Sequence, residues 1–288
     1  MTAVPDEIVQ LHCTEDDLRR EGGRALHQFG VQSTYQIHSH DFYELFLVPK
    51  GSAVHAINGR SQLLTAGSFV LIRPNDVHKY EFFNNADFEM IDIGIPTGVF
   101  LRLCAYLGVD RAVFDAPALS LHCVLSGQNL ADVQRKLLHS HRIDDPQAGY
   151  LYMLSVFPYL VGLFLSAPAP QTLLPEWLSA LLEKMDETEN FVAGLPRLLA
   201  LANMSQEHLT RSFRRYLGVT PTAFINAKRL GLAAQLLLTG ETPVIDVGGL
   251  CGFNSQSRFY RLFTERYGCP PKAFRDTFRG NSMPPASP

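Results

Sequence analysis

The sequence predicts an α+β multidomain protein, with a small β-barrel or sandwich in front and an all-helical domain behind it. Short apolar runs alternate with turn signals over residues 24–95, which is typical of antiparallel strands in a barrel. After Pro96 the apolar residues recur at helical spacing, and from Glu176 onward no strand pattern returns. At 288 residues the chain is long enough for two domains, and we place the boundary near residue 170.

The front half contains six candidate strands followed by three candidate helices. The strands are ELFLV, SAVHAI, SQLLT, SFVLI, YEFF and FEMIDIGI, and the pair Asn58-Gly59 is a strong hairpin signal. Helices are expected over residues 97–107, about 126–142 and about 147–166. Residues 167–175 contain three prolines and no charge, which is typical of a linker. The predicted division is therefore 1–166, a linker at 167–178, and a helical domain at 179–279.

Residues 150–166 form a long apolar stretch without a charge. Its length is compatible with a membrane span, but its tyrosines, the central Pro158 and the absence of a flanking Lys/Arg cluster favour a buried helix or an oligomer contact. Five scattered cysteines with no C-x-x-C pair predict a reducing compartment. The N-terminus lacks a signal-peptide pattern, so we expect a cytoplasmic protein that does not bind a membrane.

The back half is basic and repeats itself, although the whole chain has a net charge of −3. Residues 205–279 carry 11 Lys and Arg against 5 Asp and Glu. A shift of 50 residues gives nine identities among the 25 positions of residues 205–229. The identical pairs are Ser205/Ser255, Gln206/Gln256, Arg211/Arg261, Phe213/Phe263, Gly218/Gly268, Pro221/Pro271, Ala223/Ala273, Phe224/Phe274 and Arg229/Arg279. A basic, duplicated helical module indicates a polyanionic partner.

Each copy of the repeat has the pattern of a helix-turn-helix. In the first copy, Ser205 is the predicted N-cap, Phe213 lies on the apolar face, and Gly218 ends the helix. Ser255 and Phe263 take the corresponding places in the second copy. A single surface arginine is usually only solvated, but here an arginine recurs on the outward face of both copies. Because an arginine fork can bind guanine and glutamine can bind adenine, these faces predict binding to double-stranded DNA.

Residues 179–279 resemble the C-terminal domain of the AraC/XylS family of bacterial transcription regulators. The resemblance rests on LTRSFRRYLGVTPTAFINAKRLGLAAQLL and PVIDVGGLCGFNSQSRFYRLFTERYGCPPKAFR. It implies a long helix around residues 221–238 and two recognition helices in successive major grooves. Positions carried over from the family, the two N-cap serines and further outward-facing residues together give the predicted DNA-binding set. This set is Ser205, Gln206, Glu207, Thr210, Arg211, Arg215, Ser255, Gln256, Ser257, Tyr260 and Arg261.

Two positions depart from the family pattern. Gly248 stands where alanine is common, and a glycine inside a helix costs about 1 kcal/mol relative to alanine. This departure predicts a looser second module. Glu207 places an acid where a recognition helix enters the groove, and it either contacts cytosine or repels phosphate.

The stretch IHSHDFYELFLVPKG, residues 37–51, sets two histidines and a glutamate on a predicted strand. Its pattern His38-x-His40-x3-Glu44-x6-Gly51 resembles the first motif of the cupin barrels, and Gly67-x6-Pro74-x-Asp76-x-His78 matches the second in part. Alternate strand positions point to the same side, so both histidines can face inward. In metal-binding cupins these positions hold a divalent metal, so the resemblance implies His38, His40, Glu44 and His78 as ligands.

Three interpretations of these residues compete: a metal enzyme, a sensor of a small effector, and histidines that only line the barrel mouth. The DNA-reading modules favour the sensor, so we expect no enzymatic activity; a cupin metalloenzyme fused to a DNA-binding domain is the alternative. The predicted effector-binding residues are His38, His40, Glu44, His78, Tyr43 and Tyr80. The whole chain resembles regulators of chitobiose-type oligosaccharide utilisation, which implies a sugar or amino-sugar effector. We also expect a homodimer formed through residues 147–166, and RNA polymerase as a further partner.

Overall fold

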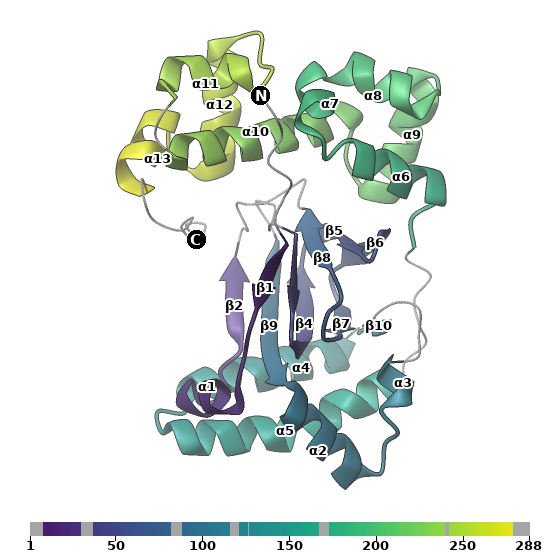
Figure 1. The fold of residues 1–288 in the computed structure, drawn as a ribbon, viewed down its shortest axis with the longest axis vertical. Coiled ribbons are helices and arrows are strands. Elements are labelled where there is room, and N and C mark those ends of the chain that lie inside the picture. The colour runs from purple at the N-terminus through teal and green to yellow at the C-terminus, as the bar shows by residue number, and fades with distance from the viewer. Residues whose placement is uncertain are drawn as a thin grey trace.

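The computed structural model describes residues 8–29, 37–81, 88–115, 121–125, 127–166, 173–239 and 242–278. It shows a β-rich part and a helical part stacked one on the other (Figure 1). The β-rich part runs from β1 to α5, and the helical part runs from α6 to α13. This arrangement confirms the predicted α+β architecture. Residues 167–172 of the predicted linker, and Arg279 of the repeat, lie outside the described residues.

Two five-stranded sheets form the barrel. The first has the order β1 (Val9–Leu11), β3 (His38–His40), β8 (His78–Glu81), β5 (Ser52–Ile57) and β6 (Arg60–Thr65). The second has the order β10 (Leu121–Val124), β7 (Ser68–Ile72), β4 (Phe42–Lys50), β9 (Glu89–Pro96) and β2 (Leu26–Phe29). β1 pairs with β3 in parallel, and the other pairs are antiparallel. The predicted hairpin at Asn58-Gly59 joins β5 to β6.

The central strand β4 shows how alternation separates two cores. Phe46 and Val48 pack inside the barrel with Tyr80 of the opposite sheet. Leu45 and Leu47 point the other way, into a larger core between the second sheet and the helices. Successive side chains of a strand point to opposite faces, so β4 supplies both cores from one run of residues.

Five helices belong to the β-rich part: α1 (Glu15–Arg20), α2 (Thr97–Leu107), α3 (Ala112–Asp115), α4 (Gly127–His139) and α5 (Pro146–Ser166). The predicted helices at 97–107, 126–142 and 147–166 are confirmed, with a short 3₁₀ turn, Ser140–Arg142, after α4. By length and composition α5 is able to cross a membrane, with a mean hydropathy of 1.6. Its inward face packs on the second sheet, where Phe164 stacks on Phe69 at 4.5 Å.

The helical part contains α6 (Glu176–Lys184), α7 (Thr188–Ala193), α8 (Leu195–Ala202), α9 (Gln206–Leu217), α10 (Pro221–Thr239), α11 (Val244–Leu250), α12 (Gln256–Tyr267) and α13 (Pro271–Phe278). The predicted N-caps are confirmed, since the hydroxyls of Ser205 and Ser255 accept hydrogen bonds from the third residue of α9 and of α12. The predicted helix ends at Gly218 and Gly268 are also confirmed, with φ of 70° and 72°. α10 connects the two helix-turn-helix modules (Figure 1).

The helical part rests directly on the first sheet of the barrel. Leu174 N donates to Ser61 O at 3.0 Å, and Leu173 forms a backbone bridge with Gln62, so the chain entering α6 extends the edge of β6. Val54 of β5 packs in one core with Leu178 and other residues of α6, α8, α9 and α10. The first helix-turn-helix module therefore shares its core with the barrel.

Candidate functional site

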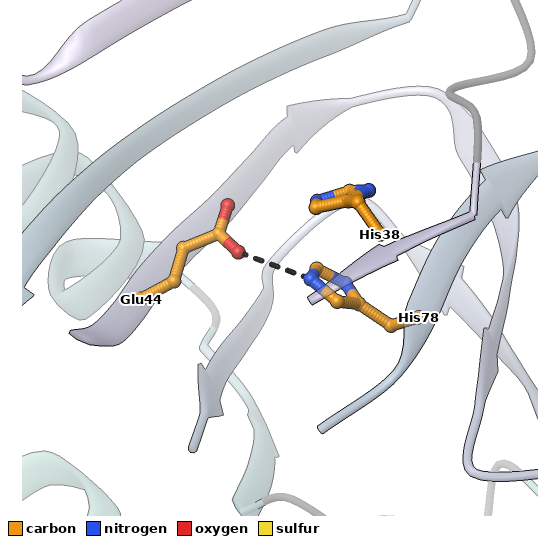
Figure 2. Close-up of side chains that lie close together, drawn as sticks. All are labelled: His38, Glu44 and His78. Carbon is orange, nitrogen blue, oxygen red and sulfur yellow. Dashed lines mark ion pairs between the residues drawn. The ribbon is translucent and has the colours of Figure 1, made fainter. Parts of the chain in front are cut away.

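Three predicted site residues meet inside the barrel (Figure 2). His38 on β3, Glu44 on β4 and His78 on β8 each place one ligand atom within 4.8 Å of the others. Backbone pairing sets His38 opposite His78, and their ring centroids are 4.2 Å apart. Glu44 Oε2 lies 3.7 Å from His78 Nε2, beyond direct hydrogen-bond distance. The three side chains come from both sheets, so the closed barrel is needed to assemble them.

His40 joins this cluster from the side. Its Nδ1 lies 2.7 Å from the carbonyl oxygen of Phe42, which only accepts, so Nδ1 carries a proton. The other ring nitrogen, Nε2, lies 3.2 Å from Glu44 Oε2. The imidazole is buried and stacks on the Phe42 ring at 4.4 Å. The Phe42 backbone thus holds the His40 ring beside Glu44.

Asp92 is a site residue that the sequence prediction missed. It lies on β9 opposite Phe46 of β4, and its carboxyl group reaches Glu44 inside the barrel. Burial, followed by the neighbouring Glu44 charge, raises the pKa of Asp92 well above its usual range. Its surroundings therefore favour the protonated form of Asp92, which can donate a hydrogen bond to Glu44. The signal in the sequence was an acid flanked by isoleucines within the strand FEMIDIGI.

The cluster opens into a cleft of about 1310 Å³ between the barrel and the helical part. His38, His40, Glu44 and Asp92 line it from the barrel. The opposite wall is formed mainly by α10, through Lys228, Gly231, Leu232, Gln235 and Leu238. A ligand in this cleft would touch both the barrel and the helix that connects the two DNA-binding modules.

Four charged residues close one side of the cleft across the boundary between the two parts. Lys228 Nζ of α10 lies 2.8 Å from Glu81 Oε1 of β8 and 2.6 Å from Asp186 Oδ1, which follows α6. Lys79 of β8 pairs with Asp186 as well. Burial alone would raise the pKa of Asp186, but the two ammonium groups outweigh burial and lower that pKa. Only 7% of the Lys228 side chain is exposed, so these pairs are desolvated.

The two tyrosines predicted for the effector site lie in different places. Tyr80 stacks on His55 with ring centroids 4.8 Å apart and lines the cleft. Tyr43 points to the other face of β4, where it stacks on Phe100 at 3.7 Å and its hydroxyl donates to Asp115 at 2.9 Å. The structure therefore does not bring Tyr43 together with the histidine cluster. Strand alternation explains this, because Tyr43 precedes the inward-facing Glu44.

The predicted DNA-binding residues form the outward faces of α9 and α12. Nine of the eleven are exposed, and Thr210 and Tyr260 are partly exposed. Arg211 lies 3.8 Å from Glu207 one turn earlier, and Arg261 lies 2.8 Å from Glu265 one turn later. Gln256 donates to the backbone carbonyl of Ile245 in α11, so its amide is partly committed within the protein.

Known proteins resemble both parts of the chain. An AraC-like ligand-binding domain matches residues 24–147, and a helix-turn-helix domain matches residues 198–277. The HTH-type transcriptional activator RhaR of Escherichia coli (strain K12) is 26% identical over 252 residues, covering 85% of this chain and 88% of the relative. RhaS of Escherichia coli O81 (strain ED1a) is 26% identical over 275 residues, with the same coverage. The chain is an AraC-type transcription regulator.

A solved structure of ToxT from Vibrio cholerae O395 covers 90% of this regulator and 99% of ToxT, at 17% identity and a TM-score of 0.34. The matched helix-turn-helix domain spans α9 and α12 and makes the regulator a DNA-binding protein. The matched ligand-binding domain spans the barrel strands from β2 to β10 and makes it a receptor for a small effector. Its relatives RhaR and RhaS are transcriptional activators rather than enzymes.

Proposed function

We propose that this regulator binds a sugar or amino-sugar oligosaccharide in the cleft and controls transcription in the cytoplasm from a specific operator sequence. The observation that carries the proposal is the shared cleft, whose barrel wall holds the histidine cluster and whose other wall is α10. An effector held there changes the relative populations of two arrangements of barrel and DNA-binding helices. The Glu44 carboxylate at the barrel wall of the cleft opposes an anionic ligand and favours a neutral or cationic one.

The domain boundaries predicted from the sequence suit this mechanism. The proposed effector-binding and dimerisation domain is 1–166, the linker 167–178 and the DNA-binding domain 179–279, but α6 already begins at Glu176, so the last three residues of that linker belong to a helix. Leu151 and Leu165 of α5 are 54% and 50% exposed, and this apolar outer face supports a homodimer. Such a dimer places four recognition helices on repeated half-sites, where RNA polymerase is the further partner.

DNA recognition is tested by removing one arginine from each recognition helix. Arg211→Ala and Arg261→Ala should each weaken operator binding by about 1–3 kcal/mol and relax the preference at one base position. Both side chains are highly exposed, so the folded structure has no need of them. Fluorescence anisotropy on an operator and on variants with single base changes measures the effect. Arg135→Ala, on α4 of the barrel part, is the control and should bind DNA like the wild type.

Effector sensing is tested through Glu44 and through ligand-induced stability. A sugar present at 100 times its Kd should stabilise the protein by about 2.7 kcal/mol, which a thermal-shift screen detects. Glu44→Gln should abolish that shift and the effector response of a reporter gene while operator binding persists. Loss of operator binding as well would assign Glu44 a structural role, and turnover of the screened sugars would favour the enzyme alternative.

A further inference from the structure

A chain of hydrogen bonds crosses the interior of the barrel and ends at the effector site. His122 Nδ1 of β10 lies 3.3 Å from Gln62 Oε1 of β6. Gln62 Nε2 lies 3.0 Å from His55 Nδ1 of β5, and His55 Nε2 lies 3.3 Å from His78 Nδ1. All four side chains are buried, with His55 and His78 at 0% and 1% exposure. None of His55, Gln62 and His122 belongs to the motifs that predicted the site.

The amide of Gln62 fixes the direction of this chain. An amide nitrogen only donates, so Gln62 Nε2 donates to His55 Nδ1, and the proton of a neutral His55 sits on Nε2. His55 Nε2 then donates to His78 Nδ1. The remaining ring proton of His78 must therefore be on Nε2, the nitrogen that faces Glu44 (Figure 2). At the other end, the amide oxygen of Gln62 accepts from His122 Nδ1.

We propose that Gln62 and His55 are positioning residues that fix the ring proton of His78 on Nε2, toward Glu44, so that the cluster offers a hydroxyl group of the effector a carboxylate acceptor and does not hold a metal ion. The inference deepens the proposed function by naming the chemical group that the effector presents. Glu44 lines the cleft whereas His78 Nε2 is buried 3.7 Å behind its carboxylate, so a hydroxyl group of the effector donates to Glu44 while the His78 N–H faces the same carboxylate from inside the barrel.

Two further observations support this direction. Burial lowers the pKa of His122 to about 4, so this ring is neutral at pH 7 and has one donor and one acceptor nitrogen. His78 Nε2 is also buried without a hydrogen-bond partner among the described residues, and it faces a carboxylate. A proton on Nε2 points toward negative charge, whereas a lone pair there would oppose it.

The same protonation pattern argues against a divalent metal at this cluster. A metal ligand must present a lone pair, and the His78 nitrogen that faces His38 and Glu44 carries a hydrogen instead. His78 is thus removed from the set of metal ligands that the resemblance to metal-binding cupins implies. The cause is the hydrogen-bond chain that runs from Gln62 through His55 to His78. The sequence motif contains the ligands but not the residues that set their tautomers.

Nitrogen NMR of the protein labelled with ¹⁵N-histidine tests the proposal directly. Long-range ¹H–¹⁵N spectra distinguish the two tautomers, and the His78→Gln variant assigns the His78 signals. We expect His55 and His78 as Nε2–H and His122 as Nδ1–H. A His78 ring protonated on Nδ1 would overturn the proposal. The spectra are recorded without DNA, so the proposal about the tautomers is tested independently of operator binding.

Gln62→Glu reverses the chain, because its carboxylate can only accept from His55 Nδ1. His78 should then become the Nδ1–H tautomer with a lone pair toward Glu44, and the affinity for Ni²⁺ should rise by about 10- to 100-fold in isothermal titration calorimetry. Gln147→Glu, an exposed site at the start of α5, adds the same charge and should leave Ni²⁺ binding unchanged. Stoichiometric Ni²⁺ binding by the wild type that His78→Gln removes would contradict the proposal. If Gln62→Glu does not fold, the wild-type tautomers alone decide the question.

Discussion

At residue 248, α11 passes so close to α12 that no side chain fits between them. A Cβ atom on Gly248 would lie 2.9 Å from Cδ1 of Phe259 and 3.2 Å from the Gln256 side-chain oxygen. Phe259 is fully buried and cannot move aside easily. The glycine that departs from the family pattern therefore allows close packing of the recognition helix, where the sequence had predicted only a looser module. That close approach also lets Gln256 reach the backbone of α11.

Replacing this glycine should destabilise the protein, although alanine is the better helix former. We expect Gly248→Ala to lower the free energy of unfolding by about 1–3 kcal/mol, because overpacking outweighs the gain of about 1 kcal/mol in helix propensity. Gly249→Ala is the matched control, since a Cβ atom there meets nothing within 4 Å. It should be neutral or slightly stabilising in urea unfolding. Equal effects of the two substitutions would show that packing against Phe259 is not the cause.

At the scale of elements, periodicity predicted the strands β4 to β9 and the longer helices but not the short elements β1, α1, β2, α3 and β10, and the faces of the strands were harder to assign. The run around Glu44 is buried on both sides, so hydrophobicity alone could not separate Tyr43, which faces the helices, from Phe46, which faces the barrel interior. The recognition helices were easier, because one face of each is apolar and the other polar. Their N-caps and glycine ends were predictable for the same reason.

The residues that support the site could not be predicted, because their partners are distant in sequence. Gln62 and His122 are 60 residues apart and meet only when β6 and β10 close the barrel. Asp92 and Glu44 meet through the pairing of β9 with β4. A motif records short spacings within one element, whereas these contacts depend on the order of strands in two sheets. The described structure is needed to find them.

The buried histidine on β10 should make the barrel sensitive to acid. Burial lowers the pKa of His122 to about 4 from 6.5, so the unfolded chain binds more protons than the folded one between these values. Stability is then lost as the pH falls from 6.5 towards 4, with a slope of at most about 1.4 kcal/mol per pH unit from this residue. In urea unfolding at pH 7, 6 and 5, His122→Gln should show a shallower decline than the wild type. His208→Gln, a substitution at an exposed histidine, should decline as steeply as the wild type. Parallel slopes for all three proteins would refute the prediction.

At the scale of the whole molecule, the barrel and the DNA-binding helices are joined by a shared apolar core and by a buried charge cluster. Val54 contributes to the core of the first module, and the pairs between Lys228, Glu81 and Asp186 lie on the wall of the effector cleft. A ligand in the cleft therefore lies beside the contacts that hold the two parts together. Because interfaces of this kind have discrete arrangements, a small change at the cleft can shift the position of the recognition helices.

Removing the central lysine should separate the two parts without unfolding either of them. In Lys228→Met, Glu81 and Asp186 must share Lys79 as their countercharge, and removing one partner of a buried pair costs about 3–5 kcal/mol. We expect a larger radius of gyration in small-angle X-ray scattering and faster proteolysis between the barrel and α6. Adding Glu81→Gln to Lys228→Met should partly restore the compact form, since one uncompensated charge is removed. Arg102→Met breaks an exposed pair with Glu15 inside the β-rich part and should leave both measurements unchanged. A compact, protease-resistant Lys228→Met protein would show that the apolar core around Val54 alone holds the parts together.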